Sequence, residues 1–102
     1  MQKKVKIEIP QASLEAFCKR YGVKKLAFFG SVLRDDFDPE KSDVDVLIEF
    51  EAGRRVGYLG LGVMELELSK MLGARVDLRT PSELSRYFRD EVIAGAEVRY
   101  AA

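Results

Sequence analysis

Residues 43–50 constrain the fold most, because apolar side chains alternate there with a second, more polar set. In an extended strand, successive side chains point to opposite faces. One face of the predicted strand then carries Val44, Val46, Ile48 and Phe50, and the other carries Asp43, Asp45, Leu47 and Glu49. A strand of this kind belongs in a sheet whose apolar face is covered and whose other face holds two neighbouring carboxylates.

The rest of the chain alternates between helical and strand patterns. Apolar spacing and helix boundary signals predict helices over residues 10–21, 31–36, 62–72 and 80–94. The other predicted segments are strands over 25–29, 43–50 and 74–79, a turn-rich loop over 35–42, a flexible glycine-rich connection over 53–62 and a tail over 98–102. This order predicts an α/β (α+β) fold, with helices flanking a small mixed sheet of three strands, in a single domain over residues 1–102.

The absence of histidine limits the chemistry that this chain can perform. Serine-His-Asp, Cys-His and ordinary zinc mechanisms are excluded, which leaves carboxylates as the candidates for catalysis. Cys18 is the only cysteine, and its neighbours Leu14 and Phe17 predict a buried thiol on a helix. Because no internal disulfide can form, a reducing compartment and a cytoplasmic location are expected.

The charge balance argues against general attraction to polyanions. Seventeen basic and seventeen acidic residues cancel, so no global field draws the chain onto nucleic acid or an anionic membrane. No stretch approaches the roughly 18 apolar residues of a membrane span. The basic residues 1–6 are not followed by the apolar run of a secretory signal. We therefore expect no membrane contact, no direct nucleic-acid binding and local capture of any charged ligand.

Three aspartates form the candidate metal site. Asp43 and Asp45 lie two residues apart on one strand face, roughly 6–7 Å from each other. Asp77 lies opposite the apolar residues of its own strand, so the three carboxylates are expected on one sheet face. Magnesium prefers carboxylate oxygens, and nucleotidyl transfer uses two metal ions. With no histidine present, Asp77 is also the candidate base for the attacking hydroxyl.

A phosphate site is expected where the strand of residues 25–29 ends. Gly30 permits close approach of a phosphate to the backbone, and Ser31 adds a hydroxyl. Arg34, one turn later, can place a guanidinium against a triphosphate. Ser42 either caps its loop or reaches a phosphate.

Several of these patterns also have ordinary structural interpretations. An Asp-x-Asp pair alone is typical of a solvated strand face, and Arg34 has an ion pair with an aspartate of segment 35–38 as its alternative role. The acid-rich loop over residues 35–45 lacks the central glycine and terminal glutamate of an EF-hand. Gly60-x-Gly62 lacks the rest of a dinucleotide-binding motif.

Two apolar groups are ambiguous between core and interface. The helix over residues 62–72 is apolar around most of its circumference, which is typical of a core helix but also of a partner-binding surface. Tyr87, Phe88 and Tyr100 have the same two interpretations.

The combined motifs resemble a known family. Gly30-Ser31-x-x-Arg34, then Ser42-Asp43-x-Asp45, then Asp77 are similar to the nucleotidyltransferase superfamily of the DNA polymerase β type, in particular its minimal nucleotidyltransferase (MNT) domains. The resemblance implies that the glycine-serine pair holds the triphosphate of ATP, that Asp43 and Asp45 hold Mg²⁺, with two ions expected, and that Asp77 completes the site. Asp35 stands where many members of the family have glycine. This difference affects the expected conformation of the loop and not the expected metal site.

The resemblance also implies a partner. MNT proteins act as antitoxins beside HEPN-domain toxins and transfer AMP from ATP to a tyrosine of the toxin. One hypothesis is therefore a Mg²⁺-dependent protein adenylyltransferase. The other is a binding antitoxin that masks its partner and carries a vestigial nucleotide site. The sequence leaves open the nucleotide preference, the acceptor residue, the number of AMP units and whether homo- or hetero-oligomers form.

Overall fold

The computed structural model describes residue 5 and residues 7–102, and its centre is a four-stranded mixed sheet. Its strands are β1 (Val23–Phe29), β2 (Val44–Phe50), β3 (Val76–Arg79) and β4 (Glu97–Ala101), in the order β3-β2-β1-β4. β1 is antiparallel to β2 and β4, whereas β2 and β3 are parallel. The predicted fold class is confirmed. The expectation for the basic segment 1–6 falls mostly on residues outside the described part.

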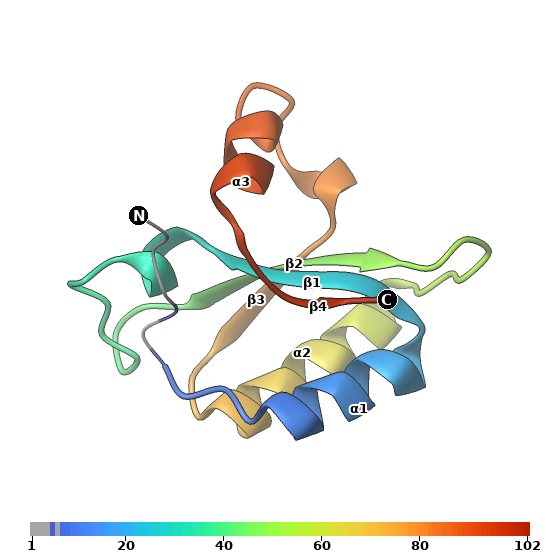
Figure 1. Cartoon of the computed structure of the whole chain (residues 1–102), viewed down its shortest axis with the longest axis horizontal. Coiled ribbons are helices and arrows are strands. Elements are labelled where there is room, and N and C mark those ends of the chain that lie inside the picture. The colour runs from blue at the N-terminus through green and yellow to red at the C-terminus, as the bar shows by residue number, and fades with distance from the viewer. Residues whose placement is uncertain (1–4, 6) are drawn as a thin grey trace.

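Helices lie on both sides of this sheet. α1 (Gln11–Tyr21) and α2 (Tyr58–Leu72) run together under one face, and the short α3 (Arg89–Gly95) stands over the other (Figure 1). Single turns of 3₁₀-helix, η1 (Gly30–Leu33) and η2 (Pro81–Glu83), follow β1 and β3. The sheet face opposite α1 and α2 is therefore only partly covered, which leaves room for a ligand site.

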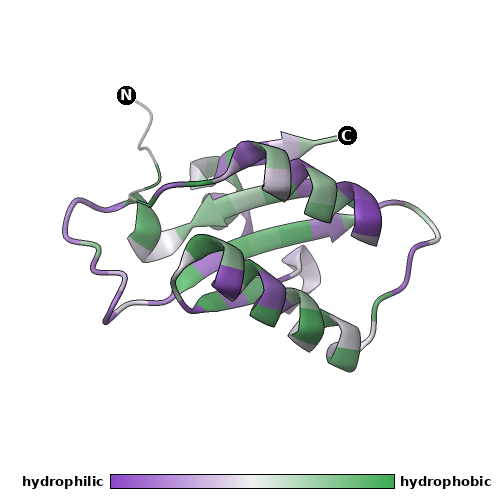
Figure 2. Ribbon diagram, turned by 90° about the horizontal axis from the view of Figure 1, so that it is seen from below, coloured by the Kyte–Doolittle hydropathy of each residue, from purple (hydrophilic) through white to green (hydrophobic). Residues whose placement is uncertain are grey.

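The core fills the layer between the sheet and the α1–α2 pair. Its fully buried side chains come from both layers and include Leu14, Phe17, Cys18, Leu26, Phe28, Val44, Val46, Ile48, Met64 and Leu68. Seen from below, α1 and α2 lie in front of strands that are coloured largely as hydrophobic (Figure 2), and the buried core residues come from these helices and strands. The predicted apolar face of β2 and the buried Cys18 thiol are both confirmed.

The C-terminal quarter differs from the prediction. Residues 80–94 do not form one helix, because Thr80 and Glu83 close a capping box around the turn η2 and the chain then turns again before α3. The predicted tail is instead β4, whose backbone pairs with β1. A five-residue edge strand carries too short an alternation to be distinguished from a tail by its pattern.

The glycine-rich segment also differs from the prediction. α2 begins at Tyr58, so Gly60 and Gly62 are helical and not part of a flexible connection. Glycine inside a helix costs about 1 kcal/mol relative to alanine. Burial of Met64, Leu68 and Leu72 in the same helix offsets this cost. Likewise, the short helix expected over 31–36 is the 3₁₀ turn η1 and ends at Leu33.

Arg54 has a structural role in the loop that precedes α2. Its Nε donates to the carbonyl of Tyr21 at 3.0 Å, and its Nη2 donates to the carbonyl of Arg20 at 3.1 Å. These are carbonyls of the last turn of α1, where helices leave acceptors without partners. The guanidinium therefore caps α1 from a loop more than thirty residues away in sequence.

α2 has an apolar outer face as well as a buried one. Tyr58 and Leu59 are about nine-tenths exposed, and Val63 and Leu66 are more than half exposed. The core interpretation is confirmed for the buried face, and the partner-binding interpretation of the exposed face stays a prediction. Tyr87 and Phe88 are also exposed, whereas Tyr100 packs against the core. Within the described residues, no helix has the length and apolar character needed to cross a membrane.

Candidate active site

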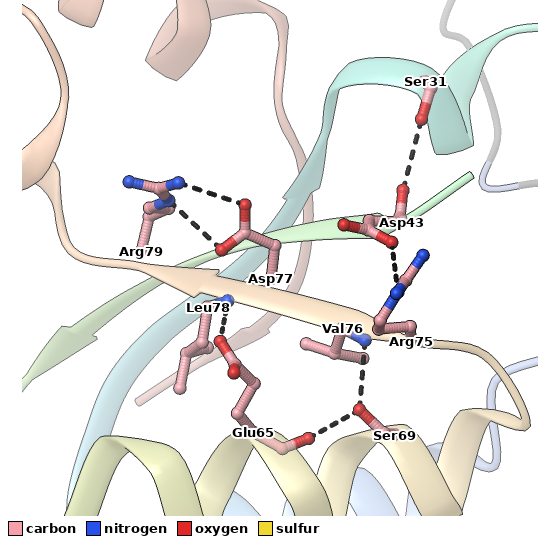
Figure 3. A network of polar contacts seen from close by, with 9 residues as sticks. All are labelled: Ser31, Asp43, Glu65, Ser69, Arg75, Val76, Asp77, Leu78 and Arg79. Atoms are coloured by element: carbon pink, nitrogen blue, oxygen red, sulfur yellow. Dashed lines mark hydrogen bonds and ion pairs between the residues drawn. The ribbon is translucent and has the colours of Figure 1, made fainter. Parts of the chain in front are cut away.

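The pairing of β2 with β3 places two of the predicted carboxylates side by side. In the parallel register, Val44 is opposite Val76 and Asp45 is opposite Asp77. The two valines are buried against the helices. Because side chains alternate along a strand, Asp45 and Asp77 project from the opposite face. Asp43 lies two residues before Asp45, and its carboxylate is on the same side of β3 as that of Asp77 (Figure 3).

Two of the three carboxylates are held by arginines. The Nε of Arg75 lies 2.6 Å from Oδ1 of Asp43. Arg79 donates from Nε and Nη2 to the two carboxylate oxygens of Asp77, each at 3.2 Å (Figure 3). Across residues 5 and 7–102, no three acidic side chains are close enough to enclose a metal ion as they stand. The fold therefore brings the carboxylates to one face without assembling them into a metal cage.

Asp45 is the carboxylate most affected by its surroundings. Burial raises its pKa, the charges of Asp77 and Asp43 raise it further, and Arg79 acts in the opposite direction. A hard cation among these side chains would relieve the repulsion that raises this pKa, and magnesium takes carboxylate oxygens as ligands. The chemistry of the donor set thus fits a divalent cation.

Gly30 is in close contact with this carboxylate. Its φ of +75° lies in the left-handed region that side chains disfavour. A β-carbon at this position would also lie only 2.5 Å from Oδ2 of Asp45. Glycine is therefore required twice, by backbone conformation and by the approach of Asp45. The turn between β1 and η1 is open to a ligand directly beside the carboxylates.

The other predicted phosphate ligands lie near this turn but have internal contacts. Ser31 donates its hydroxyl to the carbonyl of Asp43 at 3.2 Å, which joins the turn to the start of β2. Arg34 forms an exposed ion pair with Asp36 at 3.5 Å. Ser42 donates its backbone N–H to the carbonyl of Asp38 at 2.8 Å. An exposed pair of this kind contributes little stability, so Arg34 can exchange Asp36 for a phosphate.

α2 supports the strand that carries Asp77. Glu65 accepts from the backbone N–H of Leu78 at 2.8 Å, and Ser69 accepts from the N–H of Val76 at 3.0 Å (Figure 3). Since β3 is at the edge of the sheet, these N–H groups have no strand partner on that side. Sequence reasoning missed Glu65 and Ser69, although their spacing of four residues on one helix face matches alternate N–H groups of a strand.

A hollow of about 900 Å³ adjoins the carboxylate face at Gly30. Its lining includes Phe29, Gly30, Arg34, Phe88, Val92 and Val98, from the β1–η1 turn, α3 and β4. The last three escaped the sequence analysis as site residues because the boundaries of α3 and β4 were not predicted. Gly30 lines the hollow and lies against Asp45, so it connects the hollow to the carboxylates.

Comparisons with known proteins show the family of this chain. Residues 11–99 match the model of the nucleotidyltransferase domain family. Protein adenylyltransferase MntA of Thermococcus cleftensis is 43% identical over 68 residues, which span 65% of this chain and 64% of that protein. The chain thus spans less than two thirds of that relative.

Solved structures share the fold. One provisionally described as a minimal nucleotidyltransferase is 34% identical, with a TM-score of 0.68 over 84% of this chain and 85% of its own. A complex of the tri-AMPylated Shewanella oneidensis HEPN toxin with an MNT antitoxin has a TM-score of 0.64 over 90% of this chain and 70% of its own, and at 14% identity it shows the fold alone. From the matching family model and the shared fold, we conclude that this chain belongs to the nucleotidyltransferase domain family.

Proposed function

We propose that this protein transfers AMP from ATP to a protein acceptor, a tyrosine of a HEPN-domain toxin, and thereby acts as a cytoplasmic antitoxin. The observation that carries the proposal is the placement of Asp43, Asp45 and Asp77 on one sheet face (Figure 3), with Asp45 directly against Gly30. The names of the relatives support it, because one is a protein adenylyltransferase and another structure holds an AMPylated HEPN toxin.

Each residue of the site has a distinct role in this proposal. Asp43, Asp45 and Asp77 would hold two Mg²⁺ ions, which when bound neutralise charge on the triphosphate and on the departing pyrophosphate. Gly30 and Ser31 contact the phosphates through their backbone N–H groups and the Ser31 hydroxyl. Arg34 and Ser42 add contacts to the same phosphates.

The transfer itself requires one proton acceptor. The tyrosine oxygen attacks the α-phosphorus, the bond from that phosphorus to the bridging oxygen of the β-phosphate breaks, and pyrophosphate leaves. Asp77 takes the proton of the tyrosine hydroxyl. Arg79 must first release Asp77, since it occupies both oxygens of that carboxylate.

A second candidate function is favoured by the arginine contacts. Arg75 and Arg79 neutralise Asp43 and Asp77 without any metal, which suits a module that binds its partner and has no transferase activity. In that case the toxin is masked by contact alone.

One experiment separates the two functions. The wild type and an Asp43→Asn/Asp45→Asn variant are each incubated with MgATP and a HEPN-domain protein from the same source, and the intact mass of that protein is measured. We expect AMP units on the HEPN protein with the wild type only, and loss of toxin neutralisation with the variant. Neutralisation by the variant, with no added mass in either sample, would establish the masking function.

A further inference from the structure

The hollow beside Gly30 has a mixed lining, in which apolar side chains accompany Arg34, Glu91 and Glu97, and it suits a flat group with polar edges. Phe29 and Phe88 contribute aromatic rings, and Val92 and Val98 contribute aliphatic surface. Phe88 is 61% exposed and Val98 is 45% exposed, so these side chains can be reached from solvent. At about 900 Å³, the hollow is in the size range of small-molecule sites and exceeds what a single side chain needs.

The hollow is continuous with the proposed phosphate site. Gly30 and Arg34 line it, and both are assigned to the triphosphate. Phe29, also in the lining, is the register partner of Asp45 across β1 and β2. A nucleotide whose phosphates lie at Gly30 and the carboxylates therefore has its nucleoside within reach of this space.

The strand order argues against the acceptor as the occupant. Asp77, which takes the acceptor's proton, is on β3 at one edge of the sheet. The hollow lies at the opposite side, over β1 and β4. An acceptor hydroxyl beside Asp77 would thus approach from the β3 side and leave the hollow to the nucleotide.

We propose that this hollow is the nucleoside subsite, in which the base of a nucleoside triphosphate packs against Phe88 and Phe29 while the ribose lies toward Gly30. The inference rests on the proposed function, since it takes the phosphates to lie at Gly30 and Ser31. It adds a binding role for Phe88, Phe29 and Val98, which lie outside the motifs of the family.

Calorimetric titration with two ligands tests the subsite. Mg-ATP contains the nucleoside, and Mg-tripolyphosphate contains only the phosphate chain. Stacking of a base on an aromatic side chain contributes to the binding affinity. Phe88→Ala removes this stacking and should therefore weaken ATP binding about ten-fold. Binding of tripolyphosphate should be unchanged. Phe88→Trp, which keeps an aromatic face, should retain ATP affinity within about two-fold.

Tyr87→Ala is the matched control. Tyr87 is the exposed neighbour of Phe88 and is absent from the lining of the hollow. Its truncation should leave the binding of both ligands unchanged. Because Phe88 and Tyr87 are exposed, neither truncation removes a core side chain, and circular dichroism checks the fold of each variant.

The possible results separate this inference from the proposed function. If the wild type binds ATP and Phe88→Ala binds it equally well, the subsite is wrong and the proposed function stands. Equal loss of ATP and tripolyphosphate binding in Phe88→Ala would assign Phe88 to the phosphates and overturn the subsite. Unchanged ATP binding with slower transfer to the protein would assign the hollow to the acceptor. If the wild type binds neither ligand, both proposals fail.

Discussion

At the scale of single residues, the site depends on two kinds of contact. Arginines pair with aspartates, and the backbone of Gly30 lies close to the carboxylate of Asp45. Gly30 has no side chain where a β-carbon would meet Asp45, and Arg79 holds Asp77 by two hydrogen bonds. These contacts make the site sensitive to small substitutions.

Gly30→Ala should impair the site through two separate effects. Placing alanine at a positive φ costs about 1–2 kcal/mol of folding free energy. The added methyl group also displaces the Asp45 carboxylate, so binding of Mg-ATP should fall at least about ten-fold. Urea denaturation and calorimetric titration measure the two effects.

Gly53→Ala provides the control for this prediction. Gly53 also has a positive φ, of +84°, but a β-carbon there has open space around it. This variant should lose a similar amount of stability and keep its affinity for Mg-ATP. Equal affinities in the two variants would contradict the assigned contact between Gly30 and Asp45.

Asp45→Asn should stabilise the metal-free protein at neutral pH while abolishing transfer. The folded pKa of Asp45 is raised, so the carboxylate is charged less readily in the folded state than in the unfolded chain. Its contribution to stability is therefore most favourable at low pH and is lost as pH rises through the folded pKa. We expect the melting temperature of the variant to exceed that of the wild type by a few degrees at pH 7.

The pH dependence of this difference is the decisive measurement. Below about pH 3, where aspartate is largely protonated even in the unfolded chain, this gain in melting temperature should vanish. Asp36→Asn, at an exposed position of the loop, should show no comparable gain at pH 7. If Asp45→Asn is less stable than the wild type at pH 7, the charged Asp45 carboxylate is stabilised by its surroundings. Such a result would contradict the repulsion from Asp77 and Asp43.

At the scale of elements, contacts between segments far apart in sequence determine where each element ends and how it is supported. Arg54 caps α1, and Glu65 and Ser69 of α2 occupy the free edge of β3. The second contact is relevant to function because β3 carries Asp77. The core helix α2 thus supports the strand that carries the proposed base, Asp77.

Arg54→Ala should destabilise the protein by about 1 kcal/mol, because two carbonyls of the last α1 turn lose a charged donor. The shift in the urea midpoint measures this loss. Arg55→Ala is the matched control, since no hydrogen bond or ion pair is seen for Arg55 in the described part of the chain. If both variants unfold at the same midpoint as the wild type, water replaces the guanidinium fully and the cap contributes no stability.

At the scale of the whole molecule, one two-layer core joins the sheet to α1 and α2, and Cys18 lies inside it with no exposed surface. Burial and the charge of Glu15 raise the pKa of this thiol to about 12. Both its inaccessibility and its protonation suppress reaction with electrophiles. Reactivity of Cys18 therefore reports the opening of the whole core.

The folded protein at pH 8 should react with Ellman's reagent at least about 100-fold more slowly than the same chain in urea. The absorbance of the released thiolate measures the rate, and Cys18→Ala gives the background. As a linkage effect, the free energy of unfolding should also fall as pH rises from about 9 toward 12, and this part of the fall should be absent in Cys18→Ala. A native reaction as fast as that in urea would contradict the burial of Cys18.

Much of the architecture was predictable because local patterns and tertiary packing agree. The alternation in β2 and the spacing of Leu14, Phe17 and Cys18 in α1 predicted which residues are buried. β4 and α3 were not predictable in this way. β4 is stabilised by its pairing with β1, and only seven residues form α3, so neither has a pattern long enough to indicate it.

The sequence by itself determined the two-faced strand β2, the order of Gly30, Asp43, Asp45 and Asp77 along the chain, and the family to which they point, because residue type and spacing are local properties. Only the tertiary structure decided that Arg75 and Arg79 hold two of the carboxylates, that Asp45 approaches Gly30, and that α3 and β4 enclose a hollow beside them. These features depend on strand register and on the packing of segments distant in sequence, which no local pattern specifies.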